Sequence, residues 1–111
     1  RVMRDDRPFM LLRARPKPDA REPFDHWFRT VHLADVRKIP GIVRVQGAWT
    51  SGGTRLGLYY FAGTDAIGPA LESAEAASAR GAWTHWADRL EELGMEIMAP
   101  LVTLPIYETP S

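Results

Sequence analysis

The sequence of 111 residues carries 14 basic and 14 acidic residues, so its formal charge is zero, and 45% of its residues are hydrophobic. These values are typical of one compact domain with its own core, and they leave no net field to attract nucleic acid or an anionic membrane surface. The sequence contains no cysteine, which excludes disulfides, thiolate metal sites and a cysteine nucleophile.

The first predicted element is a strand. Residues 1–7 hold charged side chains of both signs, and we expect an extended or disordered N-terminus there. The apolar run Pro8–Ala14 follows and is closed by Pro16 and Pro18, which is the pattern of a buried strand. We expect residues 8–108 to form a single domain that begins with this strand.

A long helix is predicted next, from about Glu22 to Arg37. Acidic residues and a proline stand near its start, where both are tolerated. Arg37 and Lys38 stand at its end, where cations offset the helix dipole. Ile39-Pro40-Gly41 then stops the helix.

Two strands joined by a tight turn are predicted after this helix. Ile42–Thr50 is rich in β-branched residues and partly alternates in polarity. Ser51-Gly52-Gly53 is a hairpin turn signal, and Arg55–Ala62 is the returning strand. The second half of that strand is apolar on both faces, which predicts a central strand covered on both sides.

The C-terminal half predicts further helix and a last strand. A helix rich in Ala and Glu is expected over Asp65–Ser78, interrupted near its start by Gly68-Pro69 and broken again at Arg80-Gly81. Ala82–Leu93 is expected to continue as helix, and residues 95–100 stay open between strand and helix. Leu101–Glu108 is predicted as the final strand, at an edge because it contains a proline.

The predicted order is strand, helix, strand, strand, helix, strand. This split βαβ order predicts an α+β, ferredoxin-like fold in which a four-stranded antiparallel sheet carries helices on one face. Leu58, Tyr60 and their neighbours make the other face too apolar for water. A second copy of the chain would cover it, so we expect a homodimer.

One residue of the first helix does not suit a plain core. Phe24, Trp27, Phe28 and Val31 recur at helical spacing, and His32 falls on the same face. A neutral imidazole in an apolar pocket can act as a general base near neutral pH without a cofactor. The alternative is a core histidine that is hydrogen-bonded to a backbone carbonyl or a tyrosine hydroxyl.

The spacing Phe24-x-x-Trp27, then His32, then Pro40-Gly41 resembles the first-helix signature of the EthD-like family, within the dimeric α+β barrel superfamily. The resemblance implies that two chains pack their sheets into a barrel and that each chain has a pocket between its sheet and helices. Related folds host cofactor-free monooxygenases, lactone isomerases, polyketide cyclases and small decarboxylases or dehydratases. The resemblance therefore implies chemistry without a cofactor, and it leaves the type of reaction open.

We expect the pocket between the first helix, the break at Arg80-Gly81 and the sheet. Its catalytic residues would be His32 and Tyr59, because one of Tyr59 and Tyr60 must face the helices and could hydrogen-bond a substrate carbonyl. Large aromatic residues would form the substrate-binding walls: Trp27, Phe28, Trp49, Trp83 and Trp86.

The sequence thus predicts a cofactor-independent enzyme of the isomerase, cyclase, dehydratase or decarboxylase type. It would use the buried His32 as general acid or base on a small apolar, aromatic or polyketide-like carbonyl compound. A non-catalytic binder of hydrophobic ligands and a cofactor-free monooxygenase are the alternatives. No metal is expected, because His26, His32 and His85 form no ligand pair on one helix. We expect no nucleic-acid or membrane partner, and a cytoplasmic location.

Overall fold

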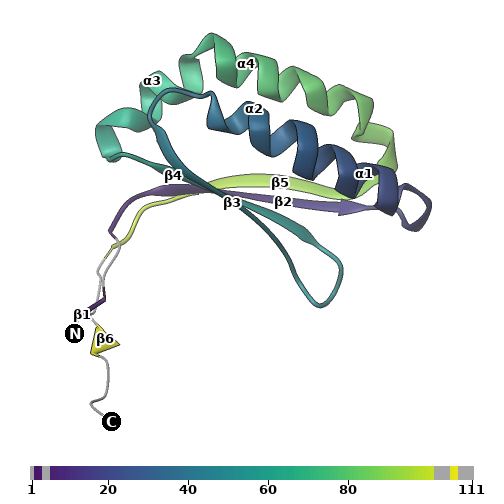
Figure 1. Cartoon of the computed structure of the whole chain (residues 1–111), viewed down its shortest axis with the longest axis horizontal. Helices are drawn as coiled ribbons and strands as arrows, with labels where there is room; N and C mark the ends of the chain where they lie inside the picture. The colour runs from purple at the N-terminus through teal and green to yellow at the C-terminus, as the bar shows by residue number, and fades with distance from the viewer. Residues whose placement is uncertain (1, 4–5, 102–105, 108–111) are drawn as a thin grey trace.

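A four-stranded antiparallel sheet forms the base of the molecule (Figure 1). The computed structural model describes residues 2–3, 6–101 and 106–107. The strands lie in the order β3-β4-β2-β5, and all neighbours are antiparallel. Their bounds are Phe9–Pro16 for β2, Ile42–Trp49 for β3, Arg55–Phe61 for β4 and Leu90–Met98 for β5. The predicted α+β, ferredoxin-like fold is confirmed, with β4 central as expected.

Two helical stretches cover one face of this sheet (Figure 1). The first runs without interruption through α1 (Arg21–Trp27), a π-helical segment η2 (Phe28–His32) and α2 (Leu33–Arg37). The second consists of α3 (Ile67–Glu72) and α4 (Ala74–Gly81). Short 3₁₀ turns accompany them: η1 at Pro18–Ala20, η3 at Thr64–Ala66, η4 at Ala82–His85 and η5 at Ala87–Arg89. Over the described ranges, no helix has the length and hydropathy that crossing a bilayer requires.

The second helical stretch has a break at Ser73 that was not predicted, and α4 ends at Gly81, where a break was expected. Ser73 is extended and caps α4, because its side chain accepts a hydrogen bond from the backbone N–H of Ala76. Gly81 keeps helical dihedral angles and leads directly into η4. Gly68-Pro69 lies within α3 and does not interrupt it. Ser73, which can cap a helix, was therefore a stronger indicator of a helix break than glycines that can keep helical dihedral angles.

The predicted helix Ala82–Leu93 is wrong in its second half. After η4 and η5 the chain enters β5 at Leu90 and pairs with β2 over its whole length. Leu93, Met95 and Ile97 alternate with Gly94 and Glu96, which is the period of a strand. This segment pairs with the free edge of β2. Local helix propensity carries no information about a pairing partner so far away in the sequence.

The predicted final strand lies outside the four-stranded sheet. Leu101 is fully exposed and belongs to no strand. Among the described residues of Leu101–Glu108, Ile106–Tyr107 form a strand, β6, which pairs with β1 (Val2–Met3) near both chain ends (Figure 1). The rest of the predicted strand falls outside the described residues. The strand at this edge of the four-stranded sheet, next to β2, is β5.

The two faces of the central strand β4 differ sharply. Tyr59 and Phe61 point to the helices and are 2% and 0% exposed. Leu58 and Tyr60 point to the other face and are only partly covered within one chain. The guanidinium of Arg44 lies 5.3 Å from the centre of the Tyr60 ring. The helix-facing tyrosine is therefore Tyr59.

Candidate functional site

His32 reaches the sheet from a widened turn of the first helix. It is the last residue of η2, where the backbone N–H of Leu33 donates to the carbonyl of Phe28, five residues earlier. Such π turns add one residue to a helical turn and often occur at functional sites. Phe28 and His32 are both buried on the face that meets the sheet.

His32 and Tyr59 form a buried hydrogen-bonded pair. The Nε2 atom of His32 lies 2.6 Å from the Tyr59 hydroxyl oxygen, and the two residues are 3% and 2% exposed. Which atom donates depends on the tautomer of the imidazole. The other ring nitrogen, Nδ1, is buried and has no hydrogen-bond partner in the part of the chain that the structure describes. Buried polar atoms of this kind are rare and call for an explanation.

Aromatic rings hold the imidazole in place. The Trp27 ring stacks on it with centroids 5.4 Å apart, and the Trp83 ring meets it edge-on at 4.8 Å. The Phe28 ring lies 5.1 Å away on the same helix. The imidazole therefore sits in an apolar frame that excludes water.

This environment keeps both partners uncharged at neutral pH. Burial lowers the pKa of His32 from 6.5 to about 4, because the charged imidazolium is poorly solvated there. Burial raises the pKa of the Tyr59 phenol for the same reason. At pH 7 the pair is thus a neutral imidazole and a neutral phenol, which is the starting state for a base and a hydrogen-bond donor.

Gly57 makes room for the Tyr59 hydroxyl. The two residues lie two positions apart on β4 and face the same side of the sheet. A Cβ atom added at Gly57 would overlap the Tyr59 hydroxyl group. The absence of a side chain at this position is therefore a condition for the pair.

A cavity of about 80 Å³ adjoins the pair. Its walls come from the helical side of the sheet and from α2, α3 and α4, and its lining is apolar apart from His32, Tyr59 and Arg80. The space exists because α3 and α4 present alanines to the sheet at this point. These are Ala70, Ala76 and Ala79, all buried and all in the lining.

The structure brings only some of the predicted wall residues to this cavity. Trp83 lines it beside His32 and Tyr59. Trp27 and Trp86 pack behind the imidazole in a cluster around Phe24, with ring centroids 5.8 and 5.3 Å from the Phe24 ring. They support the site and are not part of the cavity lining.

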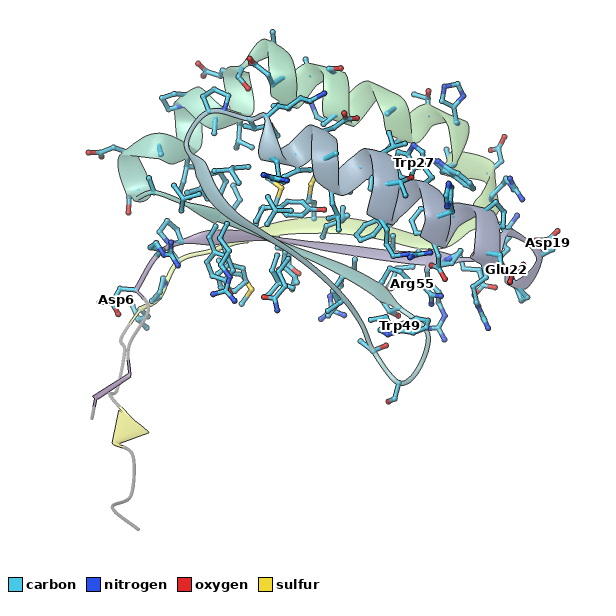
Figure 2. The ribbon with its side chains drawn as sticks, viewed as in Figure 1. Asp6, Asp19, Glu22, Trp27, Trp49 and Arg55 are labelled. Atoms are coloured by element: carbon cyan, nitrogen blue, oxygen red, sulfur yellow. The ribbon has the colours of Figure 1, made fainter. Side chains whose placement is uncertain are left out.

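Trp49 and Phe28 belong to a second, open groove of about 560 Å³ at the base of the β3–β4 hairpin. Trp49 is 68% exposed, and its ring lies 4.6 Å from the guanidinium of Arg55. Arg55 in turn donates two hydrogen bonds of 2.6 Å to the carboxylate of Asp25. Figure 2 shows Trp49 and Arg55 together at the hairpin, away from Trp27 on the helix.

Sequence reasoning predicted Trp83 but missed the alanines of the lining and the side chain of Arg80. The alanines at positions 76 and 79 and the side chains of Arg80 and Trp83 recur at helical spacing and share one face of the helix. Small residues on the face that should pack on a sheet were the available signal. Met95 was missed because its strand was expected to start later.

Other titratable groups do not extend the site. His26 and His85 are both exposed. Over the described ranges, no three His, Cys, Asp or Glu side chains are grouped as metal ligands. The chemistry available at the cavity is that of His32, Tyr59 and Arg80.

Comparison with known proteins places the fold. No protein-family model and no curated protein matches the sequence. An EthD-family protein from Bacillus halodurans superposes with a TM-score of 0.68 at 18% identity, over 85% of this chain and 99% of that chain. A cofactor-independent oxygenase, SnoaB from Streptomyces nogalater, superposes with 0.66 at 18% identity, over 90% and 98%. Rv0793 from Mycobacterium tuberculosis superposes with 0.64 at 18% identity, over 86% and 96%.

These likenesses show the fold, and they include a protein of the EthD family that the first-helix spacing resembles. At such low identity the likenesses do not show the reaction, which has to be inferred from the residues of the site.

Proposed function

We propose that this chain is a cofactor-independent enzyme in which His32 and Tyr59 move protons on a small carbonyl compound. The observation that carries the proposal is the buried His32–Tyr59 hydrogen bond on the wall of an apolar cavity. A histidine that only filled the core would adjoin packed side chains and not open space. The hydrogen bond to a tyrosine alone fits both a catalytic and a core histidine, and the adjoining cavity is the observation that favours the catalytic role.

The proposed reaction is proton abstraction next to the carbonyl group. In the tautomer where His32 Nε2–H donates to the Tyr59 oxygen, the Tyr59 O–H is free to donate to the substrate carbonyl. The unpartnered Nδ1 of His32 then carries a lone pair that can take the proton from carbon. Tyr59 holds the enolate until the imidazolium returns the proton. Return to another carbon gives isomerisation, and return to a departing hydroxyl group gives dehydration. If the enolate carbon first attacks a second carbonyl group of the substrate, the new alkoxide takes the proton and the product is cyclised.

The volume of the cavity limits the group that enters it. A cavity of about 80 Å³ is smaller than the engineered cavities of roughly 150 Å³ that hold benzene. We therefore place the reacting carbonyl and a short apolar group inside the cavity. An aromatic or polyketide-like body would extend through the mouth.

We also propose a homodimer in which the open faces of two sheets pack together. Phe9, Leu11, Leu58 and Tyr60 of neighbouring strands β2 and β4 share that face, and an apolar sheet face of this kind is rarely left in water. Sedimentation at micromolar concentration should give the mass of two chains, and a stable monomer would refute this assembly. A cytoplasmic location completes the proposal, to be checked by cell fractionation.

Proton exchange tests the chemistry directly. The chain is incubated in D₂O with small ketones, beginning with butanone and cyclopentanone, and loss of the proton signal next to the carbonyl is followed by NMR. We expect His32→Gln to slow exchange by about 100-fold, the usual contribution of a general base. His26→Gln, an exposed histidine of the same helix, is the matched control and should exchange at the wild-type rate. Equal rates for His32→Gln and the wild type would refute the proposal.

Oxygenation is the second candidate, favoured by the likeness to a cofactor-independent oxygenase. It would share the first step, because an electron-rich carbanion is the species that reacts with O₂. An oxygen electrode separates the two candidates: O₂ consumption that depends on His32 supports the oxygenase. A non-catalytic binder would keep its affinity for ligand in His32→Gln and show neither activity.

A further inference from the structure

Arg80 stands at the mouth of the cavity. It follows Ala76 by four residues and precedes Trp83 by three, so all three side chains share the face of the helix that lines the cavity. Arg80 and Met95 are exposed, whereas His32 and Tyr59 are buried. The cavity therefore reaches the surface between α4 and β5, with the guanidinium at its rim.

The charge of Arg80 has no acidic partner among the described residues. Its Nη1 donates a hydrogen bond of 3.1 Å to the backbone carbonyl of Leu71, across the break between α3 and α4. No carboxylate lies within ion-pair distance of Arg80 in the described ranges, and no acidic residue lines the cavity. The cavity thus has one formal charge, which is positive and lies at its entrance.

We infer that the substrate is a small carbonyl compound that also bears a carboxylate, and that Arg80 binds this carboxylate at the mouth. This inference rests on the proposed function and adds the class of substrate to it. The interior offers only neutral partners, so a carboxylate placed there would lose its hydration without a counter-charge. At the rim it meets a guanidinium, which suits carboxylates in charge and in geometry.

The carboxylate at Arg80 would orient the rest of the molecule. With its anionic end at the rim, the apolar part passes Trp83 and the carbonyl faces His32 and Tyr59. A purely structural Arg80, which only supports the end of α3 through Leu71, would not distinguish an acid from its amide. This difference is the basis of the test.

The test compares two probes of equal shape, butanoate and butanamide. Their dissociation constants are measured by NMR from the shift of the Trp83 indole N–H, because Trp83 lines the cavity. We expect the wild type to bind butanoate at least about fivefold more tightly than butanamide, within the range of one ion pair. The preference should vanish in Arg80→Gln and be partly kept in Arg80→Lys. It should be unchanged in Arg37→Gln, an exposed arginine at the end of α2.

Three results would overturn the inference: equal binding of the two probes, an unchanged preference in Arg80→Gln, or no binding of either probe. His32→Gln separates this inference from the proposed function. If that variant loses proton exchange and keeps the preference for butanoate, both stand. If it keeps exchange at the wild-type rate while Arg80→Gln loses the preference, the carboxylate site stands and the proposed chemistry fails.

Discussion

The two ends of the helical layer bury very different side chains against the same sheet. At the α1 end, Phe24, Trp27 and Trp86 pack ring against ring, with ring centroids 5.3 to 5.8 Å apart. At the other end, α3 and α4 present Ala70 and Ala76, and a cavity remains. Over the same sheet, the volume of the covering side chains thus differs between the packed core and the cavity.

His32 lies at the boundary between these two regions. Trp27 and Phe28 flank its ring on the aromatic side, and the cavity opens on the other. The aromatic region therefore holds and desolvates the imidazole, while the alanine region leaves a cavity beside it. Substitutions can alter one region at a time.

The largest effect is expected from opening the aromatic region. Phe24 is fully buried and contacts four aromatic rings, so Phe24→Ala should lower the free energy of unfolding by about 3–5 kcal/mol. Val31, which is 41% exposed on the same helical stretch, is the control, and Val31→Ala should change stability by about 0.5 kcal/mol or less. Urea denaturation measures both. A loss below about 1 kcal/mol for Phe24→Ala would mean that this end is not a packed core.

Acid should weaken the chain at the boundary between the regions. The pKa of His32 falls from 6.5 in the unfolded chain to about 4 in the fold, so the unfolded state binds the proton more readily. The stabilising contribution is therefore complete above pH 6.5, is lost as the pH falls toward 4, and levels off below that value. We expect a loss of about 2–3 kcal/mol between pH 7 and pH 4 from this group.

The loss due to His32 is isolated by comparison with His32→Gln. Carboxylates titrate in both proteins, so the difference between their unfolding free energies at each pH reports the histidine alone. His26→Gln should follow the wild type at every pH, since His26 is exposed. Parallel stability curves for the wild type and His32→Gln would contradict the burial of a neutral imidazole.

A smaller effect is expected at the strand beneath the pair. Gly57→Ala places a methyl group where the Tyr59 hydroxyl lies, and this overpacking should cost about 1–3 kcal/mol and displace Tyr59 from His32. The control is Gly81→Ala, because Gly81 has helical dihedral angles and open space around its Cα. Proton exchange should fall in the Gly57 variant only. Unchanged exchange would show that the hydrogen bond to Tyr59 is not needed.

The sequence predicted one of the two regions well and the other poorly. Phe24, Phe28 and His32 share a helical period with a clear stop at Pro40-Gly41, so that helix and its buried histidine could be placed from local pattern alone. The register of β4 then put Tyr59, not Tyr60, opposite His32, which alternation within one strand leaves open.

The second half of the sequence was predicted less well, because its structure depends on contacts between residues that are far apart in the sequence. β5 is specified by the free edge of β2, which lies about 80 residues earlier in the sequence, and Ala82–Leu93 carries apolar residues at spacings that also suit a helix. The cavity exists because α4 has alanines, and no larger side chains, where it faces the sheet at this point. Ala76 and Ala79 share a helical face, but alanine also stands at the exposed positions 74 and 77, so the pattern alone does not mark a cavity. The large aromatic residues of the first helix are more distinctive.

The smallest effect on stability is expected from filling the alanine region. Ala76→Val adds two methyl groups toward the cavity, and Ala77→Val, at the next and exposed position of the same helix, carries the same loss of helix propensity. The variant at position 76 should be more stable than the control by up to about 1 kcal/mol, because its methyl groups gain contacts in empty space. Its affinity for butanone should nevertheless fall by about tenfold, since the methyl groups occupy the place of the ligand. If Ala76→Val is instead less stable than Ala77→Val by more than about 1 kcal/mol, the space beside His32 is already filled, and the two ends of the helical layer do not differ as described.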